Sequence, residues 1–131
     1  MRKLLLILSI VLLANLLLTA CGASSKTDAP AKAVETYLNA LVAKDTNRLP
    51  TLVCSTWEQD ALAELDSFQA VTARLENVAC AQSGVDGKTT LVKCTGNIVA
   101  SYNNEDQKLD LSTRTYQVTQ ESGDWLVCGT R

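Results

Sequence analysis

The stretch that decides the fold is Thr89–Tyr102, which reads TTLVKCTGNIVASY. It is the second of four segments after Phe68 in which hydrophobic residues repeat with a period of two, typical of a β-strand, instead of the helical period of about 3.6. The other three segments are 72–81, 108–120 and 124–131. The C-terminal part of the chain is therefore predicted to form a sheet of four strands.

Short intervals rich in turn-forming residues separate the four predicted strands. They are 83–87, with the sequence SGVDG, 103–106, with NNED, and 121–124, with ESGD. Gly, Asn and Asp favour the tight turns of β-hairpins because they tolerate positive φ angles. Strands joined by such turns pair with their neighbours in the sequence, which predicts an antiparallel meander.

Two amphipathic helices are predicted before the sheet. In the second of these, apolar residues lie four apart from Leu49 to Leu65, and Pro50 either lies in the first turn or breaks the segment there. The two helices are expected to cover one face of the sheet, because a lone sheet would leave an apolar face in water. The predicted fold class is α+β. The first helix is marked by apolar residues spaced i, i+3, i+4, i+7 and i+8, namely Val34, Tyr37, Leu38, Leu41 and Val42.

The first twenty-one residues have the order of a secretory signal: a basic start, an apolar run and then small residues. The last four of them, Leu18-Thr19-Ala20-Cys21, resemble the lipobox of bacterial lipoproteins. The resemblance implies that residues 1–20 are a signal peptide cut before Cys21, whose sulfur carries a diacylglycerol and whose amino group is acylated, for example with palmitate. An uncleaved anchor is the alternative, since residues 4–20 lie at the lower limit for crossing a bilayer about 30 Å thick. Both interpretations place the remainder outside the cytoplasm.

The expected mature chain consists of a tether and one domain. Residues 21–30 are small and polar after the lipidated cysteine, and they are predicted to form a flexible tether to the membrane. Residues 31–131 suit a single modest core. Cleavage removes Arg2 and Lys3 and leaves 10 basic and 14 acidic residues, a net charge of −4. That balance argues against nucleic acid as a partner.

The four cysteines that follow Cys21 are expected to form two disulfides, because an even number of cysteines in an oxidising compartment usually pairs. Cys80 and Cys94 lie on neighbouring predicted strands and can face each other. Cys94 and Cys128 would lie two strands apart, about 9–10 Å, beyond the roughly 7 Å limit between the Cα atoms of a disulfide. The predicted bonds are therefore Cys80–Cys94 and Cys54–Cys128, with the second joining the second helix to the last strand.

No metal site, cofactor or catalytic residue is predicted. The chain has no histidine and no pair of cysteines at the short spacing of zinc sites. It also has no phosphate-binding glycine loop and no Ser–His or Cys–His pair. Four acidic residues of the second predicted helix are expected to form a solvated face, namely Glu58, Asp60, Glu64 and Asp66.

Two further stretches carry a resemblance to a known family. They are 33–45, AVETYLNALVAKD, and 123–127, GDWLV. Together with the plan of two helices and four strands, they resemble the small NTF2-like, or cystatin-like, lipoproteins of unknown function. The resemblance implies a curved sheet with helices on one side, enclosing a cone-shaped cavity. It does not define an activity, because this superfamily includes isomerases, dehydratases, transport factors and binding domains.

The predicted function is that of a binding module. A lipid-tethered domain would hold a small hydrophobic molecule, a peptide or another envelope protein, and the missing catalytic signature supports this interpretation. A structural or accessory role in envelope assembly is the alternative, which a continuous exposed apolar patch on the sheet would favour. Trp57 and Trp125 are the aromatic residues to examine for either role.

A third alternative is a cavity enzyme of the ketosteroid-isomerase or polyketide-cyclase kind. Those relatives place an acidic or histidine base and a proton donor in a buried cavity that tunes their pKa values. An acidic side chain and a tyrosine hydroxyl meeting in one buried pocket would favour this alternative, and their separation would exclude it. Without histidine, the candidate groups are Asp110, Glu76, Tyr37, Tyr102 and Tyr116.

Overall fold

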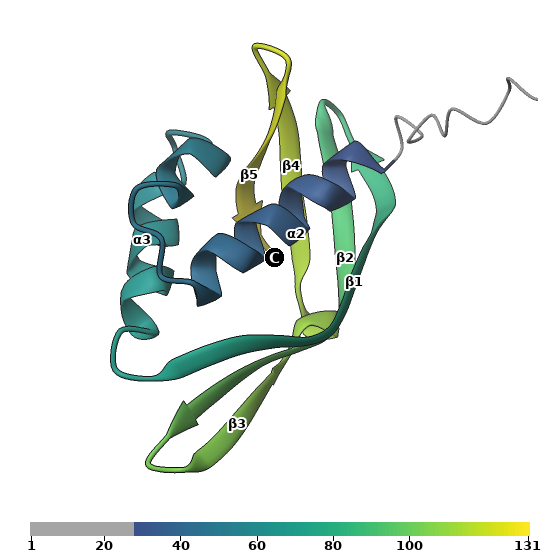
Figure 1. Ribbon diagram of the computed structural model, residues 1–131. Coiled ribbons are helices and arrows are strands. Elements are labelled where there is room, and N and C mark those ends of the chain that lie inside the picture. The colour runs from purple at the N-terminus through teal and green to yellow at the C-terminus, as the bar shows by residue number, and fades with distance from the viewer. Residues whose placement is uncertain (1–27) are drawn as a thin grey trace, which may run out of the picture.

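The structure, a computed structural model, describes residues 28–131 (Figure 1). The predicted signal peptide 1–20, Cys21 and most of the predicted tether 21–30 lie outside the described residues. The described elements are helices α2 (Ala29–Val42) and α3 (Glu58–Ser67), the 3₁₀ turns η1 (Leu49–Leu52) and η2 (Leu111–Thr113), and strands β1 (Thr72–Asp86), β2 (Thr89–Tyr102), β3 (Glu105–Asp110), β4 (Thr115–Glu121) and β5 (Asp124–Thr130).

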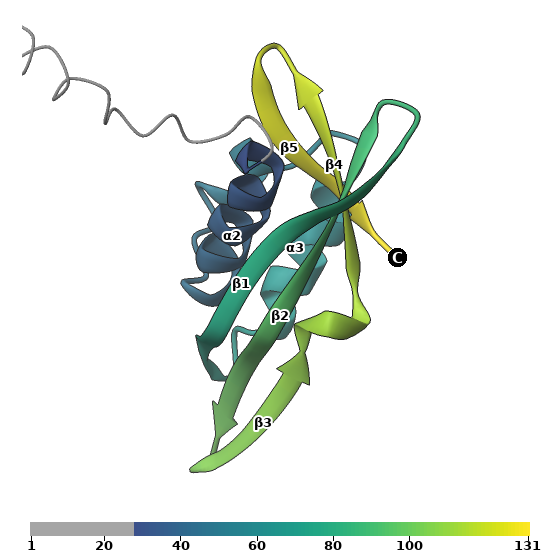
Figure 2. The same cartoon turned by 90° about the vertical axis from the view of Figure 1, so that its right-hand side faces the viewer.

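The strands form one antiparallel sheet in the order β1-β2-β4-β5, with β3 paired to β2 beside β4. Both helices lie on the same side of this sheet, as Figure 2 shows. The predicted α+β class, with two N-terminal helices on an antiparallel sheet, is confirmed. No helix within residues 28–131 is long and apolar enough to cross a membrane.

The sheet has five strands instead of the four that were predicted. The predicted strand 108–120 is divided because η2 interrupts it: the side chain of Asp110 accepts a hydrogen bond from the backbone N–H of Ser112 at 2.8 Å, and Leu111 turns into the core. After this turn the chain continues as β4. As a result, β3 pairs with the last six residues of β2, and β4 pairs with the segment 90–93.

Helix α2 follows the predicted apolar spacing. Pro30 lies in its first turn, where the missing N–H costs no hydrogen bond. Four residues of this stripe are fully buried, namely Val34, Tyr37, Leu38 and Leu41. They form one core with buried residues of η1, α3 and the sheet. Burial of this stripe, more than helix propensity, therefore fixes the orientation of α2.

The predicted second helix is wrong over its first half. Pro50 lies in the first turn of η1, after which the chain extends and Val53 pairs in parallel with Val127. The backbone N–H of Cys54 donates to the carbonyl of Val127 at 2.9 Å. The extended segment thus satisfies backbone groups on β5, and α3 begins only at Glu58.

Strands β1 and β2 form a long hairpin that bends at a bulge. The register shifts between Glu76 and Ala79, and Asn77 takes a left-handed conformation with φ of 53°. A Cβ atom at Gly96, on the opposite strand, would lie 2.4 Å from the carbonyl oxygen of Asn77. Only glycine fits this close approach, and the bend carries the β1–β2–β3 arm beyond the helices (Figure 1).

The structure contains two disulfides, Cys54–Cys128 and Cys80–Cys94. Cys80 and Cys94 are direct cross-strand partners of β1 and β2. Cys54 lies in the extended segment between η1 and α3, not in a helix, so its bond joins that segment to β5. Disulfides persist in oxidising environments, and the two bonds indicate an extracytoplasmic location.

Candidate functional site

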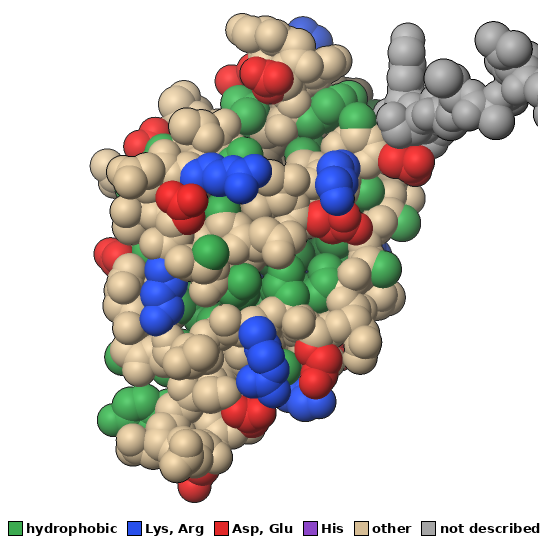
Figure 3. All heavy atoms as spheres, viewed as in Figure 1, with side chains coloured by type: hydrophobic (Ala, Val, Ile, Leu, Met, Phe, Trp, Pro, Cys, Tyr) green, Lys and Arg blue, Asp and Glu red, His purple; other side chains and the backbone are tan. Residues whose placement is uncertain are grey.

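A groove of about 620 Å³ lies between the start of α2, the turn η1 and strand β5. Its volume falls within the usual range of small-molecule sites, roughly 300–1,000 Å³. In the space-filling view, hydrophobic side chains gather between the β4–β5 hairpin and α2 (Figure 3). The lining residues are Asp28, Ala29, Lys32, Ala33 and Thr36 from α2 and the residue before it, Thr51 and Leu52 from η1, and Asp124, Trp125 and Leu126 from β5.

Small side chains on α2 leave the space that forms the groove. Ala29 and Ala33 lie at i, i+4 on the row that continues to the buried Tyr37, and Ala33 packs against the core. Together with Thr36 they line the groove, where longer side chains would take up space. Across the groove, Leu52 and Trp125 are half-buried and supply apolar surface. An apolar lining with few polar groups is typical of sites that bind hydrophobic molecules.

The charged groups of the groove belong mainly to its rim. The ammonium group of Lys32 lies 3.4 Å from a carboxylate oxygen of Glu35, and its side chain is 76 % exposed. Asp124 is also exposed and opens the β5 strand. Lys32 and Asp124 therefore place charge at the edge of the groove, next to the apolar surface supplied by α2 and Trp125.

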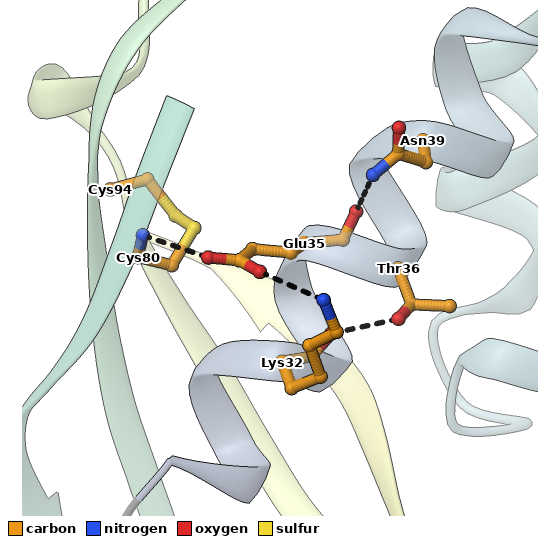
Figure 4. A network of polar contacts seen from close by, with 6 residues as sticks. All are labelled: Lys32, Glu35, Thr36, Asn39, Cys80 and Cys94. Carbon is orange, nitrogen blue, oxygen red and sulfur yellow. Dashed lines mark hydrogen bonds and ion pairs between the residues drawn. A yellow bond between two sulfur atoms is a disulfide. The ribbon is translucent and has the colours of Figure 1, made fainter. Parts of the chain in front are cut away.

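A polar network connects α2, which lines the groove, to strand β1 of the sheet (Figure 4). One carboxylate oxygen of Glu35 accepts a hydrogen bond from the backbone N–H of Cys80 at 3.3 Å, and the other pairs with Lys32. The hydroxyl of Thr36 donates to the carbonyl of Lys32 at 2.8 Å, and the Asn39 amide donates to the carbonyl of Glu35 at 2.7 Å. Glu35 thus connects α2 to β1 beside the Cys80–Cys94 disulfide.

A second polar cluster, formed by Tyr37, Glu64, Arg114 and Tyr116, lies between the helices and β4. The Tyr37 hydroxyl donates to one carboxylate oxygen of Glu64 at 2.7 Å, and the Arg114 guanidinium donates to the other. Burial, followed by the negative charge of Glu64, raises the pKa of Tyr37 far above its ordinary value. Burial also raises the pKa of Tyr116 to about 12. Within residues 28–131, the Tyr116 hydroxyl is buried without a hydrogen-bond partner.

The cluster brings Tyr37 together with an acid, Glu64, which the sequence predicts on a solvated helix face. Only 18 % of the Glu64 side chain is exposed. The available signal was its position seven residues after Trp57 and three after Ala61, at the edge of the apolar stripe of α3. Both carboxylate oxygens of Glu64 are already bound, and the groove between α2 and β5 is lined by other residues. The contacts of this cluster are therefore those of an internal anchor.

The remaining candidate groups are separated from the cluster. Asp110 is exposed and caps η2, while Glu76 pairs with Lys108 at 2.6 Å on the arm. Tyr102 is 60 % exposed and borders a smaller depression of about 260 Å³ on the arm. Of the five candidate groups, only Tyr37 forms a hydrogen bond with an acid. Tyr116 lies in the same cluster without a hydrogen-bond partner, and Asp110, Glu76 and Tyr102 lie elsewhere.

The large exposed hydrophobic side chains of residues 28–131 do not form a continuous patch. They are Val85, Tyr102 and Leu109. Val85 pairs with Thr90 at one end of β2, and Tyr102 ends the same strand twelve residues later, about 40 Å along the strand at the usual rise per residue. These exposed side chains therefore do not combine into one broad apolar surface.

The fold and the groove define a small α+β protein with two helices on one face of an antiparallel sheet. No protein-family model and no curated protein matches the chain. It is similar in structure to a SEC-C motif containing protein from Rhodopseudomonas palustris, solved in solution, with a TM-score of 0.53 and 11 % sequence identity. The similarity covers 80 % of this chain and 79 % of that one. At this identity it shows the fold alone.

Proposed function

We propose that the protein is an extracytoplasmic lipoprotein, attached to a membrane through Cys21, whose NTF2-like domain binds a small hydrophobic molecule in the groove between α2 and β5. The observation that carries this proposal is the groove itself, because it combines a suitable volume with an apolar lining from three elements. The two disulfides support a location outside the cytoplasm.

The position of the groove supports a ligand drawn from the membrane. Asp28, the first described residue, lines the groove, so the expected tether joins the domain at this site. A tether of ten residues spans at most about 35 Å when fully extended. A domain held at that distance presents the groove close to the lipid surface, where hydrophobic molecules concentrate.

A peptide or an envelope protein as the ligand, and an accessory role in envelope assembly, are less well supported. An accessory role and a protein partner are favoured by a broad exposed apolar surface, whereas the exposed Val85 and Tyr102 lie at opposite ends of β2. A cavity enzyme is also less well supported, because Glu64 is already bound by Arg114 and Tyr37.

The two tryptophans allow a direct test of ligand binding. In a Trp57→Phe variant, Trp125 is the only tryptophan, and it lines the groove. The purified full chain, reconstituted in vesicles, is titrated with a long-chain fatty acid that carries bromine atoms as fluorescence quenchers. We expect saturable quenching of Trp125, and weaker quenching after Ala33→Leu in the same background, because the larger side chain narrows the groove.

The matched control is Trp125→Phe, which leaves only Trp57. The Trp57 ring packs against Tyr37, with ring centroids 5.5 Å apart, and does not line the groove. We expect this variant to show little quenching. Equal quenching of the two variants, or no quenching of Trp125, would contradict the proposed ligand site.

Membrane attachment is tested separately by Cys21→Ser. We expect this variant to leave the membrane fraction or to keep residues 1–20, because it lacks the sulfur that a diacylglycerol would modify. Two or three acyl chains give durable attachment, in contrast to a single chain. Mature variant protein that remains in the membrane fraction would disprove lipid attachment at this residue.

A further inference from the structure

A carboxylate lies directly against one of the two disulfides. The Oε1 atom of Glu121 is 3.3 Å from the sulfur of Cys54, and one ligand atom from each of Cys54, Cys128 and Glu121 lies within 4.8 Å of the others. We infer that these three residues form a redox-gated metal site, which binds a thiophilic divalent cation such as Zn²⁺ only after the Cys54–Cys128 bond has been reduced.

The backbone keeps the two cysteines together independently of the disulfide. The Cα atoms of Cys54 and Cys128 are 4.8 Å apart. Val53 pairs with Val127, and the Cys54 N–H donates to the Val127 carbonyl at 2.9 Å. Once the sulfur–sulfur bond is opened, these few contacts and the cation itself keep Cys54 beside Cys128, so the cation takes over part of the stabilising role of the disulfide.

The distance between the carboxylate and the Cys54 sulfur is close to that of two ligands of a tetrahedral ion, and the two sulfurs separate to ligand spacing only when their bond is reduced. Zinc binds thiolate at about 2.3 Å and carboxylate at about 2.1 Å, so two such ligands at a tetrahedral angle lie about 3.6 Å apart. The observed distance of 3.3 Å between Glu121 and Cys54 is close to that value. Two thiolates and one carboxylate would leave the fourth position to water, which is the pattern of open zinc sites.

The charge around Glu121 also favours a cation. Within the part of the chain that the structure describes, Glu121 forms no ion pair with a lysine or arginine side chain. Reduction would place up to two thiolates beside this carboxylate, and like charges at such distances repel one another. A divalent cation at the centre of the three ligands removes that repulsion.

The chemical step requires a dithiol reductant. Its thiolate attacks the half-buried sulfur of Cys128, since Cys54 is only 4 % exposed. Two electrons and two protons pass to the cysteine pair, and the dithiol becomes a disulfide. The two thiols then release their protons to solvent as the cation binds both sulfurs.

The test uses Co²⁺ as a probe, because thiolate ligands give this ion a charge-transfer absorption in the near ultraviolet. The sample is the full chain with Cys21, Cys80 and Cys94 replaced by serine, so that Cys54 and Cys128 are the only cysteines. We expect no absorption change in the oxidised protein. After reduction with a phosphine, we expect binding of one Co²⁺ per chain, displaced by Zn²⁺ and weakened at least tenfold by Glu121→Gln.

The matched control keeps Cys80 and Cys94 and replaces Cys21, Cys54 and Cys128 by serine. In that chain the nearby carboxylate, Glu35, already binds the Cys80 N–H and Lys32, so we expect much weaker Co²⁺ binding after reduction. The inference is overturned if the reduced Cys54/Cys128 chain binds Co²⁺ no better than this control, whether or not it remains folded. Unchanged affinity in Glu121→Gln would overturn the assigned role of the carboxylate.

Discussion

The two disulfides are the same chemical bond in two very different surroundings. Cys80–Cys94 joins direct partners in a long hairpin that many other cross-strand residue pairs already hold together, despite two shifts of register. Cys54–Cys128 joins residues 74 apart and holds the segment after η1 against β5, where one isolated bridge is the other sheet contact. A cross-link therefore contributes most where the sheet itself does not already hold the chain.

The two disulfides also differ in the carboxylate that lies beside them, Glu35 in one case and Glu121 in the other. Glu35 is saturated by Lys32 and by the backbone of Cys80, so it fixes α2 to β1. Glu121 approaches the Cys54 sulfur and is otherwise exposed. The first carboxylate therefore connects a helix to the sheet, whereas the second lies beside the bond that joins the segment after η1 to β5.

Removal of Cys54–Cys128 is expected to have the largest effect on stability. In the chain-entropy treatment a closed loop of about 75 residues contributes about 4.5 kcal/mol to the free energy of unfolding. Because Leu52 on η1 lines the groove, the Cys54→Ala/Cys128→Ala variant should also bind the fatty-acid probe more weakly. Chemical denaturation followed by circular dichroism, together with Trp125 quenching, measures both effects. Unchanged stability would show that the bond does not hold this segment.

Removal of Cys80–Cys94 is expected to have a smaller effect. A closed loop of about 15 residues contributes about 3 kcal/mol in the same treatment, and the hairpin ladder remains in place. The Cys80→Ala/Cys94→Ala variant should therefore keep its affinity for the probe, because neither cysteine lines the groove. Denaturation midpoints of the two double variants, measured side by side, test the order. A larger loss from Cys80→Ala/Cys94→Ala would reverse the comparison.

The sequence predicted the region around Cys80–Cys94 better than the region around Cys54–Cys128, for a physical reason. Hairpin pairing is a local property, and the turn between β1 and β2 places the two cysteine-bearing segments side by side. The one-residue register shift between Gln82 and Gly84 then brings Cys80 directly opposite Cys94. The segment 49–57 has a helical spacing of apolar residues, yet its backbone is satisfied by Val127, far away in the sequence. No local pattern reveals such a partner.

The groove and the Tyr37 cluster were beyond local patterns for the same reason. In the sequence, Ala29 and Ala33 look like ordinary helix residues, because only the folded chain brings Trp125 to the same groove. Glu64 has the spacing of a surface residue until Arg114 reaches it from the start of β4. Periodicity indicates which face of a helix is buried, but it does not indicate which polar residues at the edge of that face gain partners.

Glu35→Ala is expected to have a modest effect. It removes the acceptor of the Cys80 N–H and the partner of Lys32, and a hydrogen bond of this kind contributes about 1 kcal/mol. The free energy of unfolding, measured by denaturant titration, should fall by that amount while both disulfides remain intact. Because α2 loses a connection to β1, affinity for the fatty-acid probe should also decrease. No change in either quantity would show that the connection is dispensable.

Glu121→Ala is expected to have the smallest effect in the oxidised protein, within about 0.5 kcal/mol, because exposed side chains outside special features contribute little to folding. The same substitution should remove most Co²⁺ affinity in the reduced protein. The two carboxylates then differ in kind: loss of Glu35 affects folding in the oxidised state, whereas loss of Glu121 is detected only after Cys54–Cys128 is opened. Denaturant titrations of both variants decide between these roles. If Glu121→Ala lowers the free energy of unfolding as much as Glu35→Ala does, Glu121 is a structural contact and not a ligand of the reduced site.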